Sequence, residues 1–177
     1  MDRRTLLGAG ATLLALQALP RTSEARAVLS KATAADEKFM QLALDQAQRG
    51  DLPFGSVIVG DGAVMATGHN STARSNDPTA HGEMMAIRTF LAKHRPDAFK
   101  GTTLYTSGEP CPMCMGAIIW CGISRVVFAA SIAELATHLG QIDITARQIA
   151  DATRFETIDI TGGLLASEAM QLFAEQK

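Results

Sequence analysis

Two cysteines stand out as side chains that could do chemistry. The stretch SGEPCPMC, residues 107–114, places Cys111 and Cys114 between a strand-like run at 102–106 and an apolar, helix-like run from Met115. A Cys-x-x-Cys pair at such a junction is either a redox dithiol or half of a tetrahedral zinc site. The redox interpretation has physical support, because a helix N-terminus lowers the pKa of the first thiol.

The zinc interpretation needs a further ligand, and His81 is the histidine in a comparable setting. It opens an expected helix, whereas the other histidines, His69, His94 and His138, have no ligand-like surroundings of their own. Glu83 follows two residues later, and positions i and i+2 of a helix do not share a face. We therefore expect Glu83 beside the metal, where a carboxylate can move the proton of a water at the open fourth position.

The elements that would position these residues alternate between helix and strand. Apolar periodicity predicts helices at 35–49, 78–95, 115–121 and 164–175, with an irregular helical stretch at 131–153. Two short β-runs flank Asp61 and Gly62, which is a strong hairpin signal. Further strands are expected at 102–106, 125–130 and 155–160. This order predicts an α/β fold, a three-layer α/β/α sandwich on a mixed five-stranded sheet.

The two halves, HGE at 81–83 and PCPMC at 110–114, together form the signature H-x-E…P-C-x-x-C of zinc deaminases. The sequence resembles the cytidine deaminase-like superfamily, in the branch of guanine deaminases, fungal-type cytosine deaminases and tRNA adenosine deaminases. The resemblance covers residues 35–177 and includes LPFGSVIV, GHN, NDPTAHGE and RVVFAA. It implies one Zn2+ per chain on His81, Cys111 and Cys114, with Glu83 as the proton shuttle of hydrolytic deamination.

The resemblance also implies contacts to a substrate. Asn70 matches an asparagine that hydrogen-bonds the base, and the backbone N–H of Gly82 would help hold the ring. Asp143 falls where guanine deaminases place an aspartate that contacts the base. Phe54 and Trp120 are expected either in the pocket wall or as ordinary core aromatics.

A free nucleobase is the expected substrate, with guanine favoured because guanine deaminases share the run SNDPTAH. Cytosine and tRNA adenosine remain alternatives, and the C-terminal stretch ITGGLLASEAMQLFAEQ is similar to the ending of tRNA deaminases. RNA binding relies on Lys/Arg contacts to phosphates, and a formal net charge of −2 does not favour it. Two alternatives of other classes are a periplasmic CxxC thiol oxidoreductase and a non-catalytic zinc module.

The helix that carries the cysteines is also a candidate interface. In the resembling family this helix often lies between subunits, which implies a homodimer. Cys121, two turns after Cys114, is expected to be a buried apolar residue.

The first 27 residues have the layout of an export signal. Arg3 and Arg4 precede an apolar run at 6–19, and a small-x-small pattern ends at Ala27. Paired arginines before a weakly apolar run indicate the twin-arginine (Tat) route, and the run is too short to span a membrane. We therefore expect a signal peptide at 1–27, a spacer at 28–34, a zinc deaminase domain at 35–177, and a periplasmic or secreted protein.

Overall fold

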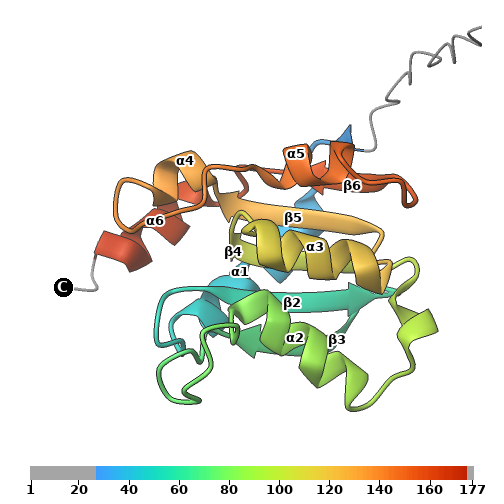
Figure 1. Cartoon of the computed structure of the whole chain (residues 1–177), viewed down its shortest axis with the longest axis horizontal. Coiled ribbons are helices and arrows are strands. Elements are labelled where there is room, and N and C mark those ends of the chain that lie inside the picture. The colour runs from blue at the N-terminus through green and yellow to red at the C-terminus, as the bar shows by residue number, and fades with distance from the viewer. Residues whose placement is uncertain (1–26, 175–177) are drawn as a thin grey trace, which may run out of the picture.

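The computed structural model describes residues 27–174 (Figure 1). Apart from Ala27, the predicted signal peptide lies outside these residues, so the export expectation stays a prediction. None of the helices in the described part of the chain has both the length and the apolarity needed to cross a bilayer.

A mixed sheet forms the centre of the fold, with strand order β1-β6-β5-β4-β2-β3. The hairpin strands β2 (Gly55–Gly60) and β3 (Ala63–His69) are antiparallel, and β2 also pairs antiparallel with β4 (Thr103–Gly108). Next to β4, the strands β5 (Arg125–Ala130) and β6 (Ile158–Thr161) continue the sheet in parallel. The parallel part places the C-terminal ends of β4 and β5 at one edge, where ligand sites of α/β sheets form.

The sheet has a sixth strand, which corrects the predicted count of five. Strand β1 (Ala27–Leu29) pairs parallel with β6 and occupies part of the segment expected to be a spacer. Three residues are too few to show a period-two pattern. The strand is defined by its partner β6 and by a hydrogen bond from the Ala27 N–H to Asp151 Oδ1 (3.1 Å).

Helices cover both faces of the sheet, which confirms the three-layer sandwich. One apolar cluster joins α1 (Ala34–Ala47) and α6 (Ala166–Ala174) to one face of the sheet. A second cluster joins α2 (Gly82–Leu91), α3 (Pro112–Cys121) and α5 (Ala146–Asp151) to the other face. Adjacent strand residues alternate between the clusters, so β5 and the middle of β2 are apolar on both faces of the sheet. Figure 1 shows α2 and α3 side by side against the sheet.

Local signals placed several boundaries correctly. The hairpin turn has positive φ at Asp61 (48°) and Gly62 (73°), as a tight two-residue turn requires. Helix α3 ends at Gly122, which adopts the left-handed conformation with φ 75°.

Helix α2 is shorter than the predicted 78–95. The Asp77 carboxylate accepts hydrogen bonds from the N–H (2.8 Å) and hydroxyl (2.6 Å) of Thr79, and this Asx turn delays the helix to Gly82. At the other end, Arg95 is extended because a proline follows it, and the 3₁₀ helix η1 (Pro96–Phe99) begins there.

The region 131–153 contains two short helices. Helix α4 (Ile132–Leu135) and helix α5 each begin with a capping box, made by Ser131 with Glu134 and by Thr145 with Gln148. These caps define helix starts in a stretch where the hydrophobic periodicity is weak.

A buried polar network fixes the start of α1 to the sheet. The Asp36 carboxylate, 2% exposed, accepts hydrogen bonds from Arg125 (2.7 Å and 3.1 Å), Tyr105 (2.7 Å) and the Thr33 N–H (2.7 Å). Arg125 also donates to the hydroxyl of Thr161 on β6 (2.9 Å). One carboxylate thus ties together α1, β4 and β5.

Candidate zinc site and its surroundings

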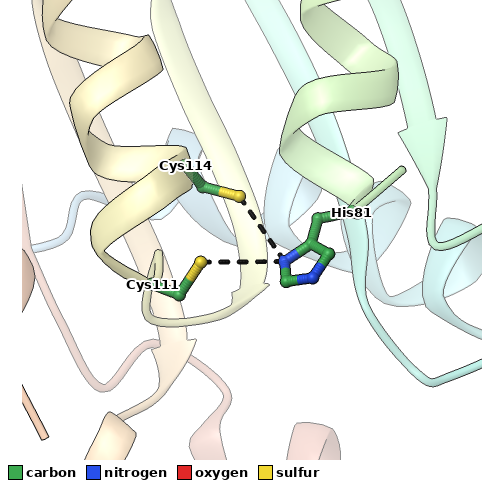
Figure 2. A group of neighbouring side chains, drawn as sticks. All are labelled: His81, Cys111 and Cys114. Carbon is green, nitrogen blue, oxygen red and sulfur yellow. Dashed lines mark hydrogen bonds between the residues drawn. The ribbon is translucent and has the colours of Figure 1, made fainter. Parts of the chain in front are cut away.

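The three predicted ligands lie at the starts of two neighbouring helices. Cys111 is the N-cap of α3, with Pro112 at the first helical position, and Cys114 follows in the first turn. His81 is the N-cap of α2. Proline suits the first helical position because its missing N–H would be unpaired there in any case. Figure 2 shows the three side chains converging from these two helices.

The distances between the ligand atoms suit one metal ion. His81 Nδ1 lies 3.7 Å from Cys111 Sγ and 3.6 Å from Cys114 Sγ, and all three ligand atoms lie within 4.8 Å of one another. Two sulfurs and one imidazole nitrogen are ligands that zinc prefers, and three protein ligands leave a fourth position open. His81, Cys111 and Cys114 are therefore positioned to hold one zinc ion.

The protons of the three ligands are shared within this cluster. The hydrogen bond from the Cys114 thiol lowers the pKa of Cys111 to about 4, with a further contribution from His81. The same hydrogen bond and burial raise the pKa of Cys114, and the hydrogen bond with Cys111 raises the pKa of His81. Metal binding requires deprotonated cysteines and a neutral histidine, so zinc would take the place of these protons.

Glu83 lies beside the ligand cluster and outside it. Its side chain is buried, with 3% of the residue exposed, and burial raises the pKa of its carboxyl to about 7. Glu83 lies in the first turn of α2, two residues after the ligand His81. A buried carboxyl next to a metal position is suited to accept and return a proton.

Asn70 and Gly82 meet at the carbonyl of Phe54. The Asn70 N–H donates to this carbonyl oxygen at 2.8 Å. A Cβ on Gly82 would lie 2.7 Å from the same oxygen, so the backbones of residues 54 and 82 are in direct contact. Asn70 is 1% exposed and lies close to the start of the helix that carries Glu83. The structure thus brings Asn70, Gly82 and Phe54 together next to the zinc ligands.

Thr72 fixes the orientation of the Asn70 amide. The Oδ1 atom of Asn70 accepts hydrogen bonds from the Thr72 hydroxyl (2.9 Å) and N–H (3.3 Å). The Nδ2 group is then the part of the amide that can donate to a ligand. Sequence reasoning missed this role of Thr72, although its position two residues after an asparagine is typical of an Asx turn.

Glu109 was also missed. It lies two residues before Cys111, is 8% exposed, and accepts hydrogen bonds from the N–H groups of Ile132 (2.9 Å) and Ala146 (2.8 Å). Its place in the EPC run, next to a metal ligand, was the available signal.

The remaining predicted contacts lie in three different settings. The half-buried Phe54 ring packs against Phe173 with centroids 5.0 Å apart. Trp120 is not at the zinc site: it is 76% exposed at the far end of α3, where its ring meets Phe155.

A cavity of about 410 Å³ next to this aromatic pair is lined by the half-buried Cys121 and by none of the zinc ligands. Asp143 is exposed in the segment between α4 and α5.

The fold and the ligand set together define a zinc-binding deaminase domain. Residues 33–130 match the cytidine and deoxycytidylate deaminase zinc-binding region. The chain belongs to this family, as the HGE and PCPMC motifs implied.

Two kinds of relative are similar to this chain. Guanine deaminase of Bacillus subtilis (strain 168) is 49% identical over 84 residues, which is 48% of this chain and 54% of that enzyme. The chain therefore matches about half of the length of that relative. The tRNA-specific adenosine deaminase of Haemophilus influenzae is 36% identical over 141 residues, covering 77% of this chain and 79% of the relative.

A solved structure agrees with the fold. It comes from a study of A-to-I editing by tRNA A34 deaminases at the wobble position of transfer RNA. It is 34% identical, with a TM-score of 0.63, and the match covers 76% of this chain and 98% of that one. The architecture and the zinc-binding motif are thus those of a deaminase.

Proposed function

We propose that this protein hydrolytically deaminates a free nucleobase, with guanine as the preferred substrate, and releases ammonia. The 49% identity to a guanine deaminase over 84 residues supports this choice. The run SNDPTAH at 75–81, which guanine deaminases share, is the second part of the segment that leads from Asn70 to the ligand His81. The backbone of this loop is closed by a hydrogen bond from the Ser71 N–H to the Ala80 carbonyl (2.9 Å).

The residues of the site have distinct tasks in this reaction. When bound by His81, Cys111 and Cys114, zinc supplies Lewis-acid activation of a water molecule. Glu83 accepts the proton of that water and delivers it to a ring nitrogen of the base. The water oxygen bonds to the carbon that bears the exocyclic amine, Glu83 passes the second proton of the water to the amine, and the C–N bond breaks to leave a carbonyl and ammonia. Burial raises the pKa of the Glu83 carboxyl above its ordinary value, which makes it a better proton acceptor.

The orientation of the Asn70 amide is the observation that supports binding of a base in this site. Because Thr72 occupies Oδ1, the Nδ2 group donates to an acceptor on the edge of the base. Guanine presents both a carbonyl oxygen and ring nitrogens as acceptors. This donor requires an acceptor on the base, which guanine supplies, and the choice of guanine over other bases rests on the 49% identity to a guanine deaminase.

The charges near the site support a small substrate over RNA. Two arginines flank His81 in the sequence, Arg74 in the preceding loop and Arg88 in α2. Arg74 forms an ion pair with Asp51 (2.6 Å), and Arg88 forms one with Asp77 (3.1 Å). An arginine that is already paired with a carboxylate contributes less to phosphate binding than an unpaired arginine does. A second candidate, deamination of tRNA adenosine, is supported by the greater length over which the tRNA deaminases match this chain.

An assay of ammonia release tests the proposal. The panel contains guanine, cytosine, adenine, their nucleosides, amino-triazines and a tRNA stem-loop, each incubated with the zinc-loaded protein. We expect guanine to have the highest kcat/KM, and Asp143→Asn to depress guanine turnover far more than thermal stability. Faster turnover of cytosine or of the stem-loop adenosine would contradict the guanine proposal and leave the deaminase assignment in place.

We also propose that the protein forms a homodimer through α3. The outer face of this helix exposes Met113 (37%) and Trp120 (76%), and large exposed aromatics are enriched at interfaces. Sedimentation equilibrium should show a dimer for the wild-type protein and a monomer for Trp120→Glu. A monomeric wild-type protein at micromolar concentration would contradict this.

A further inference from the structure

Glu109 links the metal-binding loop to a distant segment of the chain. It follows directly after β4, and its own N–H donates to the carbonyl of Ala130 at the end of β5 (2.7 Å). Its two carboxylate oxygens point to different helices. Oε2 accepts the N–H of Ile132, the first residue of α4, and Oε1 accepts the N–H of Ala146, the first residue of α5.

Each of these hydrogen bonds satisfies a backbone donor that a helix start leaves without a partner inside the helix. A buried carboxylate is costly unless its oxygens are hydrogen-bonded, and Glu109 is 8% exposed with both oxygens occupied. The segment 132–146 is thus held at both ends by one side chain. Figure 1 shows α4 at the end of the sheet where α2 and α3 begin, which is the end that carries the zinc ligands.

We propose that Glu109 is a positioning residue for substrate binding, which holds segment 132–146, with Asp143, at a fixed place relative to the zinc ligands. Only Pro110 separates Glu109 from Cys111, so the carboxylate and the metal ligand move together. Loss of one acceptor would release one end of the segment while the ligand cluster stays intact. The kinetic part of this proposal rests on the proposed function, because it needs a substrate that the segment contacts.

A second glutamate in the same region provides a matched control. Glu134 accepts hydrogen bonds from the N–H and hydroxyl of Ser131, both at 2.7 Å, and so caps α4 from the exposed side. It stabilises the same helix start, but within the described residues its side chain bonds to Ser131 and not to the metal-binding loop. If Glu109 only capped the helix, Glu109→Gln and Glu134→Gln would have the same effect on KM.

The test compares zinc-loaded Glu109→Gln, Glu109→Asp and Glu134→Gln with the wild-type protein. We expect Glu109→Gln to keep its zinc and to raise KM by about 10- to 100-fold, with a smaller change in kcat. Hydrogen exchange at Ile132 and Ala146 should become faster in this variant. Glu109→Asp, which keeps two acceptors, should recover part of the loss, and Glu134→Gln should leave KM within about 2-fold of the wild-type value.

An unchanged KM in Glu109→Gln, or an equal rise in Glu134→Gln, would overturn the proposal. If wild-type protein does not act on guanine, the proposed substrate fails, and the same comparison is made with the base that the panel identifies. If no base is turned over, exchange at Ile132 and Ala146 decides: unchanged protection in Glu109→Gln overturns the positioning role. If Glu109→Gln does not fold, Glu109→Asp takes its place in every comparison.

Discussion

The α-carbon of Gly82 lies against the carbonyl oxygen of Phe54, so closely that a Cβ at position 82 would stand 2.7 Å from that oxygen. In this chain the start of α2 leaves no room for a methyl group at this position. We expect Gly82→Ala to reduce the free energy of unfolding by about 1–3 kcal/mol, as overpacking does. Urea unfolding of the zinc-loaded protein measures this change.

Gly116 is the control for that substitution. It lies within α3, and a Cβ there would meet no atom within 4 Å. Gly116→Ala should raise the free energy of unfolding by up to about 1 kcal/mol, because alanine restricts the unfolded chain and favours the helix. Equal stability of the two variants would show that the contact between residues 54 and 82 is not tight.

The zinc ligands are tested by two cysteine substitutions on the same helix. Cys114→Ser should reduce bound zinc to less than about half an equivalent per chain after dialysis, since a serine hydroxyl is a poor replacement for a soft thiolate ligand. Cys121→Ser, which changes a thiol outside the ligand cluster, should retain one equivalent. Elemental analysis of the purified variants provides the measurement. Retention of zinc by Cys114→Ser would require a different ligand set.

Glu83→Gln separates proton transfer from metal binding. The amide has nearly the same shape but cannot accept and return a proton, so zinc content and folding should be preserved. Turnover of the substrate should fall by at least about 10²- to 10⁴-fold, the contribution typical of a positioned acid or base. Glu168→Gln, an exposed substitution on α6, should leave turnover unchanged. Near-normal activity of Glu83→Gln would refute the role of Glu83.

The network around Asp36 should make stability depend on pH. Burial by itself would raise the pKa of this carboxyl, but hydrogen bonds from Arg125, Thr33 and Tyr105 hold it well below its ordinary value. Because the folded-state pKa is lower than the unfolded one, the stabilisation is complete above about pH 5 and is lost as the pH falls toward the folded value. Asp36→Asn should lower the free energy of unfolding at pH 7 by about 1–3 kcal/mol, since Arg125 loses its nearest charge partner and keeps only the longer ion pair with Asp159 (3.7 Å).

Urea unfolding at pH 7 and at pH 3 checks this prediction. The difference between wild type and Asp36→Asn should be large at pH 7 and smaller at pH 3. Tyr105→Phe removes one hydrogen bond and keeps the charge pair, so it should cost only about 1 kcal/mol at pH 7. A difference between wild type and Asp36→Asn that does not change with pH would contradict the assigned role of the carboxylate.

The zinc ligands could be predicted because their chemistry is written into short segments. His81 and Cys111 each cap the start of a helix, and Cys114 lies in the first turn of the second one. These residue types and their local spacing were visible without knowledge of the tertiary structure. The central strands could be predicted for a similar reason, since runs such as RVVFAA are apolar on both faces. These features depend on neighbours in the sequence.

Features that depend on distant neighbours could not be predicted in this way. Strand β1 exists because β6 pairs with it. Trp120 lies at the end of α3 opposite the zinc site, and because this helix is apolar on all sides, its sequence does not indicate which side chains face the site. The role of Glu109 depends on two N–H groups that follow it by 23 and 37 residues. Such contacts appear only when the chain is folded.

The edge strand β1 has a consequence for proteolytic maturation. Its first residue, Ala27, is the one after which the small-x-small pattern predicts removal of the leader, and it is 8% exposed and paired with Ile158. The Tat route carries proteins that have already folded. A peptidase that reads its substrate as an extended strand would then compete with β6 for the same backbone. If the leader is removed, processing at that bond would require β1 to leave the sheet, whereas a cut a few residues earlier would leave the sheet whole. The first residue of the processed protein would distinguish the two routes.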